Sequence, residues 1–143
     1  MKNIIILLVF LLCSCSTIFN SGSQSFVAKA DGDKDGVEIE VVTPDTSYKS
    51  KLPATLISSP SSFSNSKIKI IDKCFNSTSY EVKKSITPSF WANFLLFAGP
   101  GIGSFGLYSF LAIPVGMSID YYNGHMWKFD KVVIVPVTAN GKC

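Results

Sequence analysis

Arginine is absent from this 143-residue chain, and histidine occurs once, at His125. Proteins that bind nucleic acids usually combine a basic surface with arginine contacts to phosphate, whereas the formal net charge here is only +3. The composition therefore argues against nucleic-acid binding. A structural zinc site would need about three ligands besides His125, and the sequence has no Gly-x-Ser-x-Gly nucleophile elbow. We accordingly expect no cofactor and no enzymatic activity.

Charged residues are also missing from Ser85 to Ile119. Within this stretch Phe90 to Met117 is nearly all apolar, but Gly99-Pro100-Gly101 stands at its centre. Glycine costs about 1 kcal/mol and proline about 3 kcal/mol in a helix interior, which disfavours one continuous transmembrane helix. The pattern instead predicts an apolar α-hairpin, two short helices joined by a glycine-rich break, inserted at about residues 88–119.

Aromatic residues and lysines border this predicted hairpin, an arrangement that membrane interfaces favour. Three roles are open for it: completion of the domain core, entry into a bilayer, or self-association. Its candidate contact surface consists of Phe90, Trp91, Phe94, Phe97, Phe105, Phe110, Met117 and Trp127.

The first residues of the chain follow the pattern of a secretory signal peptide. Lys2 precedes an uninterrupted apolar run from Ile4 to Leu12, which is much shorter than the roughly 20 residues of a membrane-spanning helix. Leu12-Cys13-Ser14-Cys15 follows, so that Cys15 has a leucine at −3 and a small residue at −1, as a bacterial lipoprotein signal requires. Cys13 would instead have the bulky Leu12 at −1. We therefore predict a signal peptide at residues 1–14 and lipidation of Cys15.

The lipid on Cys15 would decide where the protein is located. Two or more acyl chains, palmitate among them, provide stable membrane attachment. Ser16 occupies the position where an aspartate would favour retention in the inner membrane. The prediction is therefore the periplasmic face of the outer membrane, or the cell membrane in a bacterium that has only one. An ordinary cleaved signal and a buried apolar N-terminal element are the alternatives.

Two cysteines follow Cys15 in the chain, Cys74 and Cys143. Outside the cytoplasm an even pair of thiols is typically oxidised, which predicts one disulfide bond that fastens the end of the chain to the domain. Closing a loop of this length would contribute roughly 4 kcal/mol in the chain-entropy estimate. Two free thiols are the alternative.

The rest of the chain predicts a β-rich domain. Residues 15–24 are assigned to a tether and residues 25–143 to a single domain, in which residues 43–66 are mostly loop because they are rich in serine and proline. Alternating β-branched segments predict strands at residues 25–30, 36–42, 54–57, 67–75, 78–86 and 131–138. Pro136 places the last strand at a sheet edge or a bulge. The expected fold is α+β: a small antiparallel β-sandwich with the apolar α-hairpin inserted before the last strand.

The segment DGDKDG resembles the first half of an EF-hand calcium loop. Asp31, Asp33 and Asp35 occupy positions 1, 3 and 5, and Gly36 occupies position 6. The second half does not follow the motif, because position 12 is Val42 rather than a bidentate glutamate. We therefore prefer a solvated hairpin turn, which Asp and Gly favour, and keep the three aspartates as weak candidates for calcium ligands.

Four stretches in order along the chain resemble a group of small bacterial envelope lipoproteins: CSTIFNSGSQSF, KSKLPATL, FWANFLLF and GMSIDYYNGHMWKFDKVVIVPV. Members carry a β domain similar to the PEGA module, a glycine-rich apolar hairpin and a Gly-x-x-Ile-Asp-x-x-Thr-Gly-Ala-Met-Trp-like motif. That motif maps to Gly116, Ile119, Asp120, Gly124, Met126 and Trp127, with Asn123 and His125 in place of the commoner threonine and alanine. The resemblance implies an envelope lipoprotein without known catalysis, and it implies no substrate.

Together these patterns predict a lipid-anchored, non-enzymatic envelope lipoprotein with a structural or accessory contact role. Its partners would be the membrane, through the lipid, and an envelope protein or a second copy of the chain. Asp120 is expected to cap or hydrogen-bond the turn YYNG that follows it. The alternatives are a calcium- or ligand-binding envelope module centred on DGDKDG and an oligomerising subunit of a secretion or pore assembly.

Overall fold

A computed structural model describes residues 22–32, 34–91, 106–141 and 143 of the chain. These residues belong to two compact units. The β unit comprises Ser23–Ser85 and Phe129–Cys143, and the helical unit contains Gly22 and the described part of Ile86–Lys128. The predicted signal peptide at residues 1–14 and the centre of the predicted apolar hairpin lie outside the described residues.

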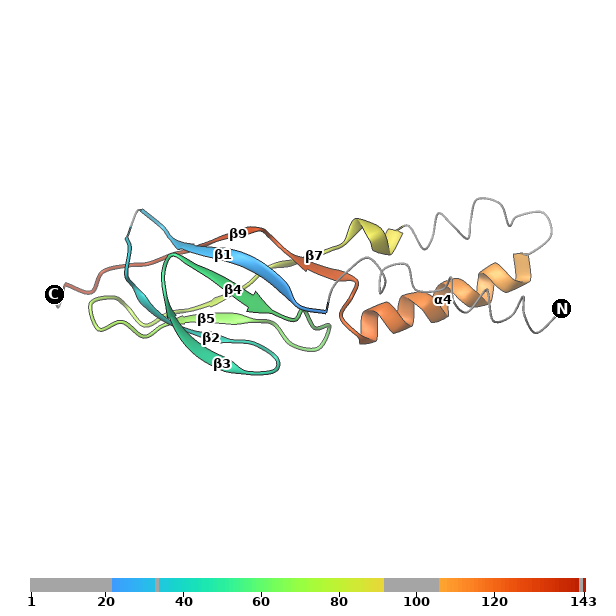
Figure 1. Cartoon of the computed structure of the whole chain (residues 1–143), viewed down its shortest axis with the longest axis horizontal. Coiled ribbons are helices and arrows are strands. Elements are labelled where there is room, and N and C mark those ends of the chain that lie inside the picture. The colour runs from blue at the N-terminus through green and yellow to red at the C-terminus, as the bar shows by residue number, and fades with distance from the viewer. Residues whose placement is uncertain (1–21, 33, 92–105, 142) are drawn as a thin grey trace. The chain divides into compact units, whose positions relative to one another are not determined.

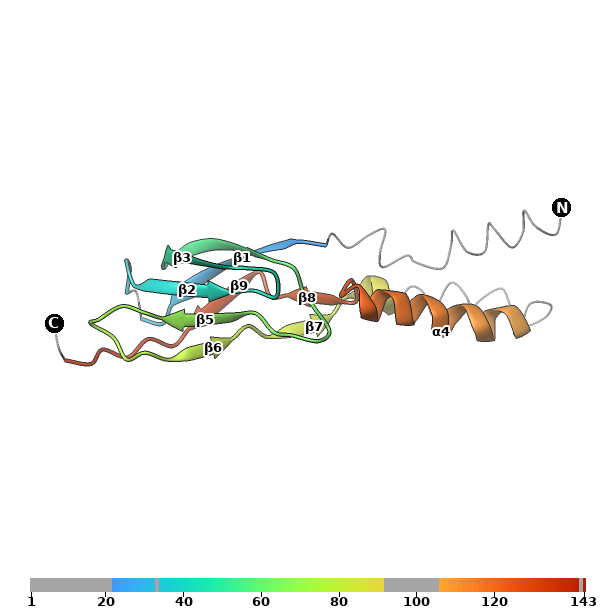
Figure 2. The same ribbon diagram turned by 90° about the horizontal axis from the view of Figure 1, so that it is seen from below.

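The regular structure of the described residues is mainly strand (Figures 1 and 2), and the strands are arranged in three sheets. The first sheet has the order β4-β1-β9, with β1 at Gln24–Ala30, β4 at Ala54–Ser58 and β9 at Val132–Val135. The second has the order β3-β2-β5-β6, with β2 at Glu38–Val42, β3 at Ser47–Lys51, β5 at Lys67–Ile70 and β6 at Ser79–Glu81. The third pairs β7 (Lys84–Ile86) with β8 (Trp127–Phe129).

One strand pairing differs from the antiparallel arrangement expected from the sequence. β1 pairs antiparallel with β4 but parallel with β9, in a register that places Val27 opposite Val132 and Lys29 opposite Ile134. The expectation of an entirely antiparallel arrangement is therefore wrong at this pair. Alternation within a strand reports which side chains are buried but not the direction of its neighbour, and a parallel neighbour needs a long crossover connection.

The strands of the β unit bury alternate side chains in a common core. In β2, Ile39 and Val41 are fully buried while Glu38 is exposed, and β5 repeats the pattern with Ile68 and Ile70. The buried cluster draws on both larger sheets and consists of Phe26, Ala28, Val37, Ile39, Val41, Leu52, Leu56, Ile68, Ile70, Val82, Phe129, Val133, Val135 and Val137. Phe26 and Phe129 pack with their ring centroids 5.3 Å apart.

The outer face of the four-stranded sheet carries complementary charges on neighbouring strands. Glu38 lies opposite Lys51 and Glu40 opposite Lys69, with nitrogen–oxygen distances of 3.2 and 3.7 Å. Exposed pairs of this kind add little to stability. They do favour the observed register, because a slip by one residue would place these charged side chains on the core side of the sheet.

The loop between β4 and β5 is held by buried and partly buried polar groups. The hydroxyl oxygens of Ser58 and Ser66, both buried, lie 2.7 Å apart. Lys84 reaches into the same loop, where its ammonium group donates hydrogen bonds to the carbonyl oxygens of Ser61 and Ser64. Burial lowers the pKa of Lys84 from the ordinary value of 10.5, and the nearby Glu81 carboxylate partly opposes this effect.

We expect Lys84 to titrate below 10.5 in an NMR titration of its side-chain carbon signals. The folded state binds this proton less tightly than the unfolded chain, so the contribution of Lys84 to stability rises as the pH increases from its folded pKa toward 10.5. Glu81→Gln should lower the pKa of Lys84 further. Glu40→Gln removes a carboxylate that pairs with Lys69 on the same sheet and should leave the pKa of Lys84 unchanged. An equal response to both substitutions would contradict the assignment.

The helical unit contains α4 (Gly106–Tyr122) and a short helical segment at residues 88–91. α4 extends beyond Met117, where the apolar stretch ends, and it includes Pro114. It ends at a turn in which the backbone N–H of Asn123 donates to the carbonyl oxygen of Ile119. In this turn Gly124 has a φ of 76°, the left-handed conformation that commonly terminates helices. In the part of the chain that the structure describes, no helix is long and apolar enough to cross a membrane.

Candidate functional site

The predicted lipidation site, Cys15, lies outside the described residues, but its connection to them is short. Only residues 16–21 separate Cys15 from Gly22, and β1 begins at Gln24. Gly22 lies next to His125, because a Cβ atom placed on Gly22 would be 3.9 Å from His125 Nε2. The segment that leads from Cys15 therefore arrives beside the turn that follows α4.

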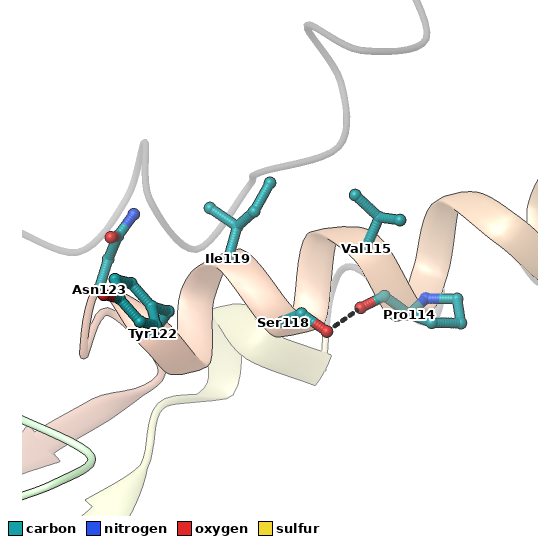
Figure 3. A pocket seen from close by; sticks show the side chains of 6 residues that line it. All are labelled: Pro114, Val115, Ser118, Ile119, Tyr122 and Asn123. Carbon is teal, nitrogen blue, oxygen red and sulfur yellow. Dashed lines mark hydrogen bonds between the residues drawn. The ribbon is translucent and has the colours of Figure 1, made fainter.

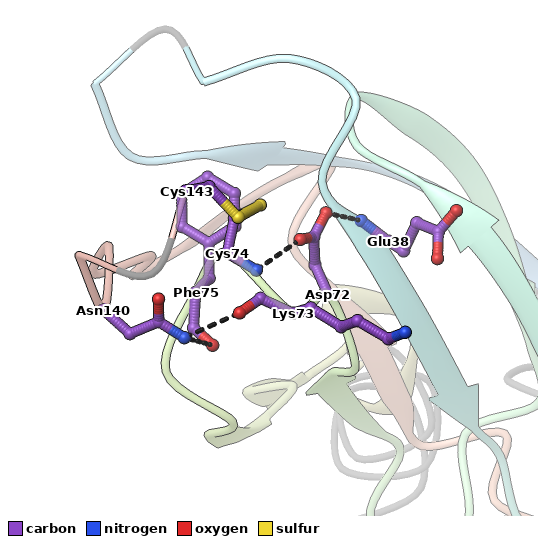
Figure 4. The surroundings of a disulfide bond; sticks show 7 residues. All are labelled: Glu38, Asp72, Lys73, Cys74, Phe75, Asn140 and Cys143. Carbon is purple, nitrogen blue, oxygen red and sulfur yellow. Dashed lines mark hydrogen bonds between the residues drawn. A yellow bond between two sulfur atoms is a disulfide. The ribbon is translucent and has the colours of Figure 1, made fainter.

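The two remaining cysteines lie together in the β unit (Figure 4). The sulfur atoms of Cys74 and Cys143 are 1.97 Å apart and their Cα atoms 5.3 Å apart, across a sequence separation of 69. This is the pair predicted from the sequence. The bond attaches the last residue of the chain to the turn that follows β5.

Hydrogen bonds fix this turn and the C-terminal segment independently of the disulfide bond (Figure 4). The Asp72 carboxylate accepts from the backbone N–H groups of Cys74 and Glu38, at 2.9 and 3.2 Å. The Asn140 side chain donates to the carbonyl oxygens of Lys73 and Phe75, at 2.7 and 3.3 Å. Asp72 and Asn140 thus have structural roles that the sequence analysis did not assign. Asn140 bonds backbone groups that are distant in the sequence, and Asp72 combines a local bond to Cys74 with a distant one to Glu38.

The predicted turn DGDKDG is held by its central lysine. Lys34 donates a hydrogen bond of 2.7 Å to the carbonyl oxygen of Val137, and its ammonium nitrogen lies 6.0 Å from the centroid of the Phe75 ring. Asp31 and Asp35 are exposed, and Asp33 lies outside the described residues. A lysine ammonium in this position adds positive charge to the loop, which disfavours a cation there.

The described residues outside this turn were also considered as possible metal ligands. Among those residues, no group of three or more His, Cys, Asp or Glu side chains is arranged to hold a metal ion.

The predicted contact surface of the hairpin is only partly described. Phe94, Phe97 and Phe105 lie outside the described residues, and Phe110 lies in α4. Phe90 is buried, whereas the neighbouring Trp91 is 54% exposed and meets the Phe90 ring edge-on at a centroid distance of 5.7 Å. Met117 and Trp127 are half-buried. Phe90 is therefore covered, whereas Trp91 is accessible to contact.

One side of α4 presents apolar side chains that were not part of the predicted contact surface (Figure 3). We call this side the α4 stripe; it consists of Pro114, Val115, Ser118, Ile119 and Tyr122 and, with Asn123, lines a shallow pocket. Its spacing of three and four residues is that of one helix face. The Ser118 hydroxyl donates to the carbonyl oxygen of Pro114 at 2.7 Å. The hydroxyl group of the one serine in the stripe is therefore hydrogen-bonded to the backbone of its own helix. Helical periodicity did not identify this face, because apolar and small residues occur around the whole of α4.

The other side of the same helix is buried. Gly116 is buried, and Asp120 has no exposed surface although it carries the only ionisable carboxylate of α4. The backbone carbonyl of Asp120 accepts from the N–H of Met126 at 3.3 Å. Asp120 thus closes, through its backbone, the turn that it was predicted to stabilise.

The outer face of the three-stranded sheet is the second described surface with exposed apolar side chains. Ile57, Val132 and Ile134 are 60%, 52% and 60% exposed. At the β4 edge of this sheet, the Tyr48 hydroxyl bonds both the N–H and the carbonyl oxygen of Ile57, each at 3.1 Å. This face contrasts with the charged outer face of the four-stranded sheet, and its residues were missed because their alternation predicted strands without indicating which side would be covered.

Comparison of the chain with protein-family models, with curated proteins and with solved structures found no match.

Proposed function

We propose that this protein is an envelope lipoprotein, held by acyl chains on Cys15 at the periplasmic face of the outer membrane, and that it acts through contact rather than catalysis. The observation that carries the proposal is the sequence Leu12-Cys13-Ser14-Cys15 directly after a short apolar run with a lysine at its start. The short connection from Cys15 to the first described residue supports it, because it provides a tether between a lipid and a folded unit.

The disulfide bond supports the same location. Cys74 and Cys143 are bonded in the structure, and such bonds persist in the oxidising compartments outside the cytoplasm. The apolar side chains exposed on the α4 stripe and on the outer face of the three-stranded sheet support a contact role, since exposed apolar patches often mark interaction surfaces.

The domain that the tether carries is, in this proposal, a small β-sandwich with an inserted apolar α-hairpin. A core that draws on strands of both larger sheets supports the sandwich. The helix at residues 88–91 and α4, on either side of the glycine-rich centre, support the hairpin. The parallel pairing of β1 with β9 makes this sandwich mixed rather than purely antiparallel.

Lipidation is tested by expressing the full chain with its own signal in a two-membrane bacterium supplied with a clickable palmitate analogue. We expect the label on the wild-type protein, and a mature N-terminal peptide that starts at Cys15 and carries the mass of its acyl groups. Cys15→Ala should abolish the label. Incorporation is the correct readout because an unprocessed signal peptide can itself retain the variant at the membrane.

The matched control is Cys13→Ala, which changes the neighbouring cysteine of the same segment and should keep both the label and the cleavage position. An unlabelled wild-type protein would contradict the proposal. A label that is lost in Cys13→Ala and kept in Cys15→Ala would show that Cys13, rather than Cys15, carries the acyl chains.

A further inference from the structure

The exposed side of α4 lacks the charge that a water-facing helix normally carries. Val115, Ile119 and Tyr122 are 47%, 41% and 74% exposed, and the adjoining Tyr121 is 44% exposed. Asp120 is the only ionisable acidic or basic residue of α4, and it is fully buried. A surface helix usually places charged or polar residues opposite its buried face. The α4 stripe is therefore an apolar surface without an exposed charge.

The length and the end point of the tether indicate what covers this surface. Residues 16–21 connect Cys15 to Gly22, so the connection can span at most about 25 Å even when fully extended. Gly22 lies against His125, in the turn directly after α4. From Tyr122 back to Val115 the helix rises only about 10 Å. A lipid on Cys15 would thus keep the whole stripe within a few nanometres of the bilayer surface.

We propose that the α4 stripe is a second membrane contact, which lies in the interfacial region of the bilayer that holds the acyl chains of Cys15. Val115 and Ile119 enter the boundary of the acyl region, and Tyr121 and Tyr122 remain at the level of the headgroups, where tyrosine is favoured. The inference rests on the proposed function, because only an acylated Cys15 brings the tether to the membrane.

A bilayer fits the stripe better than a second copy of the chain does. Stable protein interfaces bury about 800 Å² on each partner with roughly 20 residues, whereas the stripe offers five residues, one of which is a serine bonded to its own helix. A membrane requires no such area, because the tether already supplies a high effective concentration.

The test uses the full-length, acylated protein in vesicles of phosphatidylethanolamine and phosphatidylglycerol. Ile119→Cys is labelled with an environment-sensitive NBD fluorophore; Cys74 and Cys143 are bonded to each other and Cys15 is acylated. Ile57→Cys is the matched control, because Ile57 is also an exposed isoleucine: its exposed fraction is 60%, and that of Ile119 is 41%. Val115→Cys is a second probe of the stripe and replaces the first if Ile119→Cys does not fold.

At position 119 we expect blue-shifted emission, at least about twofold quenching by lipids with a nitroxide on the acyl chain, and little quenching by aqueous iodide. At position 57 we expect quenching by iodide and not by the nitroxide lipid. Efficient iodide quenching at position 119 in acylated protein would overturn the inference and leave the proposed function intact.

Other outcomes also decide the question. Quenching at position 119 by neither agent, together with cross-linking between chains, would show that a second copy covers the stripe and would overturn the inference. Equal quenching by lipid at positions 57 and 119 would overturn the assignment to α4. If mass spectrometry shows an unmodified Cys15, the proposed function itself fails, and this result is distinguishable from all the others.

Discussion

Replacement of both Cys74 and Cys143 by serine is expected to lower the free energy of unfolding by about 4 kcal/mol. The bond spans a sequence separation of 69, and without it the unfolded chain regains the entropy of that loop. A loss of this size is a large part of the 5–15 kcal/mol that stabilises a typical domain. The measurement is urea unfolding of the mature protein and of the double variant in the same mild detergent, followed by circular dichroism.

Chemical reduction provides the control for this prediction. Dithiothreitol should destabilise the wild-type protein by a similar amount and should not affect the double variant. A wild-type protein that is insensitive to the reductant and matches the variant in stability would show that the two thiols are not bonded in solution.

The native structure should survive the loss of the bond, because Asn140 still fastens the C-terminal segment. Its side chain bonds the carbonyl oxygens of Lys73 and Phe75, and its N–H bonds the carbonyl oxygen of Cys74. Under native conditions the amide hydrogens of Asn140 and Asn76, which both bond across this junction, should remain protected from exchange in the double variant. The disulfide bond therefore acts mainly on the unfolded chain rather than on the shape of the folded one.

The parts of this structure that the sequence predicted are those with a local signal. β2 and β5 alternate charged and aliphatic residues, and each has its aliphatic side chains in the core. The disulfide pairing followed from counting, since Cys74 and Cys143 were the only pair left once Cys13 was assigned to the signal peptide and Cys15 to lipidation, with two free thiols as the alternative. The strands could be predicted from neighbouring residues in the sequence, and the disulfide bond from the number of cysteines.

β3 and β8 were missed because their stability depends on partners elsewhere in the chain. β3 reads SYKSK and was assigned to a loop, yet its two lysines lie opposite glutamates of β2, and Lys51 makes an ion pair with Glu38. β8 has three residues and exists through its pairing with β7, more than 40 positions away in the sequence. Such edge segments satisfy their backbone groups against a distant strand, which a polar local sequence does not reveal.

The α4 stripe illustrates a different limit of the sequence. The lack of charge from Ser85 to Ile119 correctly indicated an apolar segment, but the attention to its bulky aromatic residues favoured Phe90, which is buried. Besides Trp91, which the prediction included, Val115, Ile119 and Tyr122 are exposed, and the latter three have helical spacing. The composition identified the apolar segment. Which side of α4 is covered is decided by packing, which buries Gly116 and Asp120.

Leu56→Ala should reduce the free energy of unfolding by about 2–5 kcal/mol, whereas Ile57→Ala, one residue later, should cost less than about 1 kcal/mol. Leu56 is 1% exposed and packs in the shared core, so its truncation leaves a cavity. Ile57 is 60% exposed, and the hydrogen bonds of Tyr48 reach its backbone rather than its side chain. Denaturant unfolding of the two variants beside the wild type measures both effects.

This pair of substitutions also tests the register of β4 against β1, in which Leu56 lies opposite Phe26 and Ile57 opposite Ser25. A slip by one residue would turn every side chain of β4 to the other face. In that case Ile57→Ala would cause the larger loss in the free energy of unfolding and Leu56→Ala the smaller one. Similar losses in both variants would mean that β4 is covered on both faces. A large loss confined to Leu56→Ala would support a one-sided sheet whose outer face, with Ile57, Val132 and Ile134, remains available for contact.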